Sequence, residues 1–384
     1  MSKHVSLQQS IALLKKLVSI NTGSYNQAGI ESCIDLLIDT FAIFSCNYEK
    51  KWVQTNDNQQ RCAAICFNKH PDAPKQCLLS IHLDTVFDQD SPFQTFDLID
   101  DNHATGPGVI DAKGGIVILY NTLLQLEQSA IAGNIGWTVI ISTDEEIGTI
   151  YSNPLLEQLA PLHDLALVFE PALTNGDIIN QRPASANIAI TAYGKSAHAG
   201  RGAFDGVNAI VPLVHFLEQL QQMTDLHTAE HTINIGTIKG GERENIIPDV
   251  AQAILNARFM DQKKLEDFID QLDQLAHQLT SADQQSIKVE TLSLRPAKPN
   301  SPIAKQCHQL LLDCAQSLQM PITIQSSFGV SDANFIAACN LPVIDTLGAI
   351  GSGMHTVEET IYLPSLVDRS ELVFEFLKAY LNQA

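Results

Sequence analysis

The segment Leu78-Leu79-Ser80-Ile81-His82-Leu83-Asp84-Thr85 is an apolar run that ends in a histidine and an aspartate. Such a run is typical of a buried strand. Similar strand-like runs recur along the chain near 61–68, 137–143, 164–169, 322–326 and 341–347. Helical patterns lie between several of them, for example at 114–128. Strands that alternate with helices predict an α/β domain in which a mixed, largely parallel sheet has helices on both faces.

Residues 184–294 follow a different pattern. Strand-like runs and two amphipathic helical segments alternate there in the order β-α-β-β-α-β, which is typical of a ferredoxin-like α+β unit. The expected strands lie near 186–193, 231–239, 250–259 and 286–294. The Pro-rich stretch 295–302 then returns to the α/β domain. We therefore expect residues 1–182 to form the first part of the α/β domain, 183–295 an inserted domain, and 296–384 the second part.

The amino-acid composition argues against binding to nucleic acid or to a membrane. The 384-residue chain has a formal net charge of -20, so its surface is poorly suited to bind nucleic acid or an anionic membrane. Residues 6–20 have the spacing of an amphipathic helix rather than of a secretory signal. The eight cysteines mostly lie in apolar surroundings, and we expect free thiols and a cytoplasmic location. Cys62 and Cys66 could alternatively form a metal pair.

Two segments carry residues able to bind metal. His82 and Asp84 are two apart, so in a strand their side chains point the same way, although the His-x-Asp pattern is common. The Gly-rich segment 106–115 delivers Asp111 just before an expected helix. The alternative for Asp111 is an ordinary turn residue that caps the helix N-terminus.

Three further segments place acidic or imidazole groups at the end of an apolar run or in a glycine-containing loop. Asp144-Glu145-Glu146 ends the run at 137–143, and three adjacent acids there are costly to bury unless cations neutralise them. The alternative for this segment is a solvated acidic loop. Glu170 ends the run at 164–169, and His355 lies in a glycine-containing loop. In open α/β sheets ligands bind beyond the carboxyl ends of the strands, which is where several of these groups would meet.

The order of these motifs resembles the M20 metallopeptidase family, and its glutamate carboxypeptidase group more than its deacetylases. The resemblance covers nearly the whole chain, including the inserted domain. The matching motifs are His82-Leu83-Asp84-Thr85, Gly106–Gly115, Thr143–Gly148, Glu170-Pro171 and the loop of His355.

The resemblance implies an active site with two divalent metal ions. Asp111 would bridge the ions, with His82 and Glu170 completing one site. Glu146 and His355 would complete the other. Zn²⁺ is the expected ion, although Co²⁺ or Mn²⁺ would accept the same ligands.

The resemblance also implies roles beside the metals and in the inserted domain. Glu145 would act as general base, and Asp84 would orient a metal ligand. His198 would hydrogen-bond the developing oxyanion in the active site of a partner subunit, so a homodimer through the inserted lid and dimerisation domain is expected. Asn245 and Arg258 would hold the substrate carboxylate.

The expected reaction is hydrolysis of an amide bond in a small peptide or N-acyl amino acid, in the manner of a carboxypeptidase. Two alternatives stay open. One is removal of an acyl group from an amino acid, of the acetylornithine deacetylase or succinyl-diaminopimelate desuccinylase type. The other is aminopeptidase action on small peptides.

Overall fold

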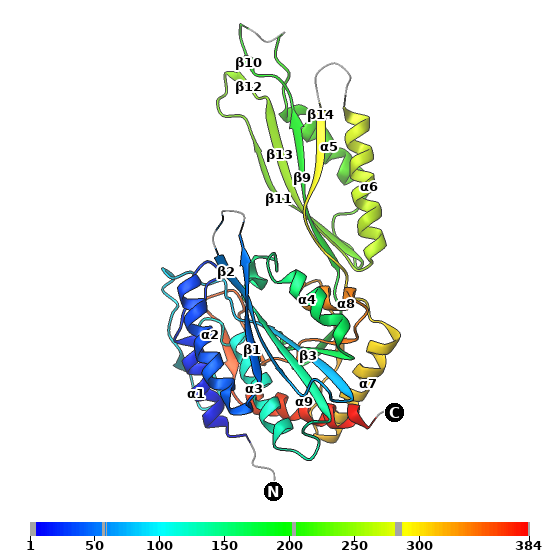
Figure 1. The fold of residues 1–384 in the computed structure, drawn as a ribbon. Coiled ribbons are helices and arrows are strands. Elements are labelled where there is room, and N and C mark those ends of the chain that lie inside the picture. The colour runs from blue at the N-terminus through cyan, green and yellow to red at the C-terminus, as the bar shows by residue number, and fades with distance from the viewer. Residues whose placement is uncertain (1–4, 56–57, 59, 202–204, 281–285, 383–384) are drawn as a thin grey trace. The chain divides into compact units, whose positions relative to one another are not determined.

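The computed structural model describes residues 5–55, 58, 60–201, 205–280 and 286–382 (Figure 1). The chain divides into two compact units. Unit 1 consists of Met1–Asn180, Asn300–Ser326 and Ser331–Ala384. Unit 2 consists of Gln181–Pro299 together with Ser327–Val330. The inserted unit thus takes in a short segment that we had assigned to the second part of the α/β domain.

Unit 1 is built on a mixed six-stranded sheet. The strands lie in the order β1-β2-β6-β3-β7-β16. Their bounds are β1 Asn47–Gln54, β2 Gln60–Lys69, β6 Ile135–Ser142, β3 Lys75–His82, β7 Leu165–Val168 and β16 Val343–Ile344. The pairs from β6 to β16 are parallel, whereas β1 with β2 and β2 with β6 are antiparallel. The predicted mixed, largely parallel sheet is confirmed.

Helices cover both faces of this sheet because alternate side chains of its strands are apolar on each face. One face packs against α1 Leu7–Val18, α2 Gln27–Phe41, α3 Lys113–Glu127, α7 Pro302–Ser317 and α9 Ser365–Leu381. The other face packs against α4 Asn153–Leu159 and α8 Ala333–Ala338. Three short 3₁₀ helices, η1 Ala42–Phe44, η2 Glu145–Ile147 and η3 Ala160–Leu162, complete the helical elements described.

Two smaller sheets in unit 1 hold the loops around the sheet's carboxyl edge. One has the order β17-β18-β5-β4 and joins segments far apart in the sequence. Its strands are β17 Gly351–Ser352, β18 Thr360–Tyr362, β5 His103–Thr105 and β4 Asp97–Leu98. The other pairs β8 Ile178–Gln181 with β15 Ile324–Ser326.

Unit 2 has the predicted β-α-β-β-α-β order. Its four-stranded antiparallel sheet has the order β11-β13-β9-β14, and α5 and α6 pack on one face. The elements are β9 Ala184–Tyr193, α5 Ile210–Met223, β11 His231–Gly240, β13 Val250–Phe259, α6 Gln262–Leu279 and β14 Ser286–Arg295. A two-stranded ribbon of β10 Ala197–His198 and β12 Ile246–Ile247 extends the unit.

All eight cysteines are free thiols, as predicted, and burial raises the pKa of each. Cys62 and Cys66 lie buried in β2 and belong to neither group of side chains that could hold a metal ion, so the alternative of a cysteine metal pair has no support. Within the described ranges, no helix has the length and apolar character needed to cross a bilayer.

Candidate active site

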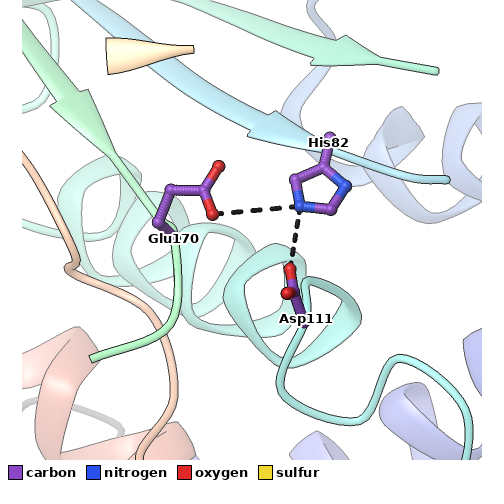
Figure 2. Close-up of side chains that lie close together, drawn as sticks. All are labelled: His82, Asp111 and Glu170. Atoms are coloured by element: carbon purple, nitrogen blue, oxygen red, sulfur yellow. Dashed lines mark hydrogen bonds and ion pairs between the residues drawn. The ribbon is translucent and has the colours of Figure 1, made fainter. Parts of the chain in front are cut away.

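His82, Asp111 and Glu170 lie together at the carboxyl edge of the unit 1 sheet (Figure 2). The Nε2 atom of His82 is 3.0 Å from Oδ1 of Asp111 and 3.9 Å from Oε2 of Glu170. All three side chains are buried. One atom from each lies within 4.8 Å of the others, so one metal ion can contact all three.

A second group shares Asp111 with the first. It contains Asp111, Glu146 and His355, again with one ligand atom of each within 4.8 Å of the others. The Nε2 atom of His355 is 3.1 Å from Oδ2 of Asp111 and 3.3 Å from Oε2 of Glu146. The two oxygens of Asp111 therefore face different histidines, so this carboxylate would offer one oxygen to each group.

The parallel strands explain why these residues meet. His82 is the last residue of β3, and Glu170 follows the end of β7 by two residues. Glu146 lies in η2, four residues after the end of β6. Because the carboxyl ends of parallel neighbours meet at one edge, the three side chains share that edge. His355 is carried there by the loop between β17 and β18.

Glycines bring the loop of Asp111 close to this edge. A Cβ atom at Gly115 would lie 2.2 Å from the carbonyl oxygen of Phe169, so only glycine lets the first turn of α3 approach the end of β7 this closely. The N-cap of α3 is Ala112, with no side-chain capping hydrogen bond. Asp111 is therefore not the capping residue, and its carboxylate faces His82 and His355 instead.

The electrostatics of the cluster match a cation site. Burial, followed by the charge of Asp111, raises the pKa of Glu146 to about 8. The hydrogen bond to Asp111 raises the pKa of His355 to about 9. Burial lowers the pKa of His82, but the carboxylates of Glu170 and Asp111 raise it by more, to well above its usual value. Crowded buried carboxylates bind protons in this way when no cation neutralises them.

The donor set also fits divalent metal ions. Two imidazole nitrogens and three carboxylates are a suitable shell for two ions such as Zn²⁺. Among the residues that the structure describes, the buried Oε1 atom of Glu146 has no hydrogen-bond partner, and a metal ion would supply one. The side chain of His355 is 55% exposed, so this side of the centre is open to an incoming molecule.

Asp84 contacts three parts of the centre. Its backbone oxygen is 3.0 Å from Nδ1 of His82, which leaves Nε2 of that ring free to act as a ligand. Its carboxylate accepts hydrogen bonds from the backbone N–H groups of Glu145 (3.1 Å) and Glu146 (3.2 Å), and from the hydroxyl of Ser24 (2.7 Å). Asp84 thus contacts the ring of His82 through its backbone oxygen, and its carboxylate fixes the segment of Glu145.

The three adjacent acids at 144–146 have different surroundings. Glu146 belongs to the second group, and Glu145, half-buried beside it in η2, belongs to neither group. Asp144 accepts hydrogen bonds from the N–H groups of Tyr151 and Ser152 and from the hydroxyl of Ser152. Hydrogen-bond donors of the protein thus stabilise the charge of Asp144, and of the three acids only Glu146 belongs to a group that could hold a metal ion.

Two supporting carboxylates escaped the sequence analysis. Glu359 is fully buried and accepts hydrogen bonds from the N–H groups of Gly108 (3.0 Å), Ile110 (2.9 Å) and Asp111 (3.1 Å). Burial raises its pKa to about 7. It lies only four residues after His355, but nothing in the sequence shows that it pairs with a loop some 250 positions earlier.

Asp332 is the second. Its carboxylate accepts hydrogen bonds from the hydroxyls of Ser142 (2.8 Å) and Thr149 (2.6 Å), which stand at the two ends of the segment that carries Glu145 and Glu146. Asp332 thus supports the segment that carries the two glutamates.

His198 and Asn245 lie together in the ribbon of unit 2. The N–H of Ala199 donates to the backbone oxygen of Asn245 at 3.0 Å. The Nδ1 atom of His198 accepts hydrogen bonds from the N–H groups of Gly200 (3.0 Å) and Arg201 (3.2 Å). The proton of the neutral ring is therefore on Nε2, and the exposed side chain presents a hydrogen-bond donor.

Arg258 lies at the other end of the unit 2 sheet, opposite Ser185 of β9. It donates through Nη1 to the backbone oxygen of Phe328 at 2.7 Å and through Nε to Asn256 at 3.0 Å. Eight residues of β13 separate it from Val250, where the sheet meets the ribbon, which is about 26 Å of extended strand. Unit 2 of one chain therefore does not bring Arg258 together with His198 and Asn245.

Comparison with known proteins follows the same division of the chain. Residues 180–284 match a peptidase dimerisation domain. Carboxypeptidase G2 from Pseudomonas sp. (strain RS-16) is 28% identical over 359 residues, which cover 90% of this chain and 83% of that protein. Succinyl-diaminopimelate desuccinylase from Pelagibacter ubique is 24% identical over 397 residues, which cover 96% of this chain and 98% of that protein.

The fold has close counterparts among solved structures. An M20 family metallo-carboxypeptidase from Sulfolobus solfataricus superposes with a TM-score of 0.72 at 16% identity, covering 97% of this chain and 99% of that one. Fold, paired metal-binding groups and relatives together define a metallohydrolase. Over most of its length the chain is similar to M20 family peptidases, and carboxypeptidase G2 is among its relatives.

Proposed function

We propose that this enzyme uses two divalent metal ions to hydrolyse an amide bond beside a free carboxylate, in small peptides or N-acyl amino acids. The observation that carries the proposal is the pair of three-residue groups that share Asp111. His82 and Glu170 would complete the shell of one ion, and Glu146 and His355 that of the other. When bound, the two ions would lower the pKa of a water molecule and polarise the scissile carbonyl. Zn²⁺ is the ion we propose, with Co²⁺ or Mn²⁺ as alternatives.

Glu145 is the proposed general base. It follows the end of β6 beside Glu146, and Asp84 fixes its backbone through the N–H group. Its carboxylate would take the proton of the attacking water and then deliver it to the leaving amine. A positioned group of this kind contributes about 10²–10⁴-fold to the rate.

Arg258 is the proposed partner of the substrate carboxylate. Its guanidinium donates hydrogen bonds to two neutral groups, the amide of Asn256 and the backbone oxygen of Phe328. No carboxylate pairs with it among the described residues, although the chain has 43 acidic residues and only 23 lysines and arginines. A half-buried guanidinium without an acidic neighbour favours an anionic ligand, and a carboxylate matches its fork.

A homodimer through unit 2 would complete the site. His198 and Asn245 are too far from Arg258 along β13 for one chain to place all three around a small substrate. His198 would therefore donate its Nε2 hydrogen to the oxyanion in the partner's site. The exposed apolar side chains of Ile210, Val211 and Val214 on α5, with Ile238 on the edge strand β11, support a contact surface for a second copy.

The similarity to a desuccinylase supports one alternative function, which is the removal of a simple acyl group from an amino acid. Hydrolysis of a panel of N-acyl amino acids and blocked dipeptides separates the readings. We expect cleavage with a preference for one C-terminal residue. Cleavage of acetyl or succinyl derivatives alone would move the enzyme to the deacylases, and loss of cleavage when the N-terminus is blocked would indicate an aminopeptidase.

A further inference from the structure

The face of the unit 2 sheet opposite α5 and α6 carries a row of amides next to Arg258. Strand register aligns Asn234 of β11, Asn256 of β13, Asn187 of β9 and Ser293 of β14 across all four strands. The neighbouring row contains Thr232, Arg258, Ser185 and Arg295. Neither of these two rows contains an acidic residue, so the carboxylate of a substrate bound to Arg258 would not be repelled by a carboxylate of these rows.

Three side chains of the amide row form a directed hydrogen-bond chain that ends on Arg258. Nε of Arg258 donates to Oδ1 of Asn256 at 3.0 Å. Nδ2 of Asn256 donates to Oδ1 of Asn187 at 2.8 Å. Nδ2 of Asn187 donates to Oγ of Ser293 at 3.0 Å. Each amide both accepts and donates a hydrogen bond, so this series of hydrogen bonds fixes the oxygen Oδ1 of Asn256 toward the guanidinium.

The guanidinium is thereby held at two of its three nitrogens. Asn256 takes Nε, and the backbone oxygen of Phe328 takes Nη1. The structure gives Nη2 no hydrogen-bond acceptor among the residues it describes. Because the guanidinium is planar, two fixed nitrogens determine the direction in which Nη2 presents its hydrogens.

We propose that Asn256 is a positioning residue that orients Arg258 for the substrate carboxylate. This inference rests on the proposed function, in which Arg258 receives that carboxylate. An amide is suited to the task because it orients the guanidinium without neutralising it, whereas an acidic residue in its place would compete with the substrate for the positive charge. Asn187 and Ser293 would fix Asn256 in turn.

The test compares one substrate in two forms. The N-acyl amino acid or blocked dipeptide that the enzyme cleaves best is assayed beside its C-terminal carboxamide, which lacks the negative charge. We expect Asn256→Ala to raise KM for the carboxylate about tenfold, because the guanidinium loses one of the two contacts that fix its orientation. We expect kcat and the kinetics of the carboxamide to change less than about twofold.

A double-mutant cycle shows whether Asn256 acts through Arg258. In the Arg258→Ala background, Asn256→Ala should raise KM less than about twofold further. Asn234→Ala is the matched control, because Asn234 stands in the same row and is exposed, and it should leave KM unchanged. Equal thermal unfolding midpoints of the variants would exclude a general loss of structure.

The outcomes separate this inference from the proposed function. If Arg258→Ala weakens only the carboxylate substrate and Asn256→Ala does not, the inference is wrong and the proposed function stands. If Asn256→Ala has the same effect with and without Arg258, its role is independent of Arg258 and the inference is wrong. If the wild-type enzyme cleaves no substrate of the panel, the proposed function fails and this inference with it.

Discussion

Three buried aspartates hold the segment that carries Glu145 and Glu146. Asp84 binds the N–H groups of both glutamates, Asp144 closes the turn that follows, and Asp332 ties the two ends of the segment together. Hydroxyl and N–H groups donate hydrogen bonds to all three carboxylates. Such neutral dipoles partly offset the burial of the carboxylates and add no competing cation beside the proposed metal site.

Replacement of Glu145 by glutamine tests its role as the base. The amide keeps the size of the side chain but cannot take up a proton, so we expect kcat to fall about 10²–10⁴-fold. The number of metal ions bound per chain should not change, because Glu145 belongs to neither metal-binding group. Metal analysis of the purified variant checks this second point, and turnover at the wild-type rate would remove Glu145 from the mechanism.

Glu359 tests how the Asp111 loop is held. Replacement by alanine would leave three N–H groups without their acceptor, and each such group costs about 1–3 kcal/mol when buried. We expect Glu359→Ala to lower the unfolding free energy by at least about 2 kcal/mol and to weaken metal binding. The neighbouring Glu358 is exposed, and Glu358→Ala should stay within about 0.5 kcal/mol of wild type. Equal metal affinity of Glu359→Ala and wild type would contradict the account.

Among the elements, the sequence predicts best those with a continuous apolar run or a clear helical period. β2, β3, β6, β7 and the four long strands of unit 2 were expected within a few residues. The edge strand β1 was missed because it is largely exposed and lacks an apolar run. The helices α2, α7 and α9 were not predicted, although side chains from all three enter the main core.

The site was predictable where a chemically distinctive side chain follows a strand, as with His82, Glu146 and Glu170. It was not predictable where the partner is backbone. Asp332 and Glu359 bind hydroxyl and N–H groups from segments distant in sequence, and an acid that accepts such bonds looks like any other acid in a loop. The same holds for Asn256, whose meaning depends on strand register.

Glu127 joins the end of α3 to two strands and gives a pH-dependent prediction. It accepts hydrogen bonds from Lys69 and from Nε1 of Trp137 (2.9 Å), and lies 3.1 Å from His70. Burial raises its pKa, but these hydrogen bonds lower it by more, to below 4.5. A carboxyl whose folded pKa is lowered contributes stability above its unfolded pKa, and this is lost as pH falls through the folded pKa.

We therefore expect Glu127→Gln to reduce the unfolding free energy by about 1–2 kcal/mol at pH 7. Because protonation removes the same interaction from the wild type, the difference should shrink as pH falls below 4.5. Urea unfolding at pH 7 and pH 3.5 measures both values. Glu375→Gln is the control, since its ion pair with Lys378 is more exposed and should contribute less than about 1 kcal/mol. If the difference in unfolding free energy between Glu127→Gln and wild type grew at pH 3.5, the folded pKa of Glu127 would be raised rather than lowered, and this prediction would be wrong.

At the scale of the whole molecule, the chain passes between the units at 180/181 and 299/300, and again on either side of 327–330. The first two passages fall within or next to the stretches 177–184 and 295–300, where we expect a hinge that closes the lid. Scattering profiles with and without a tight inhibitor test the closure. Identical profiles would contradict it.

Mixing two inactive variants tests whether His198 acts across a dimer. His198→Ala lacks the donor and Glu145→Gln lacks the base. If His198 serves the partner's site, a mixed dimer has one site with both groups intact. Subunit exchange should then restore up to about a quarter of wild-type activity, by random pairing of two chains. If His198 serves its own chain, no mixed dimer has a complete site and activity stays absent.

The most direct measurement is titration of metal-stripped enzyme with Zn²⁺ while hydrolysis of the best panel substrate is followed. Because two groups of metal-binding side chains share Asp111, we expect activity to rise from near zero and to reach its plateau at two ions per chain. Co²⁺ and Mn²⁺ should restore activity with the same stoichiometry. Full activity in the stripped enzyme, or no hydrolysis with any of the three ions, would contradict the proposed two-metal hydrolase.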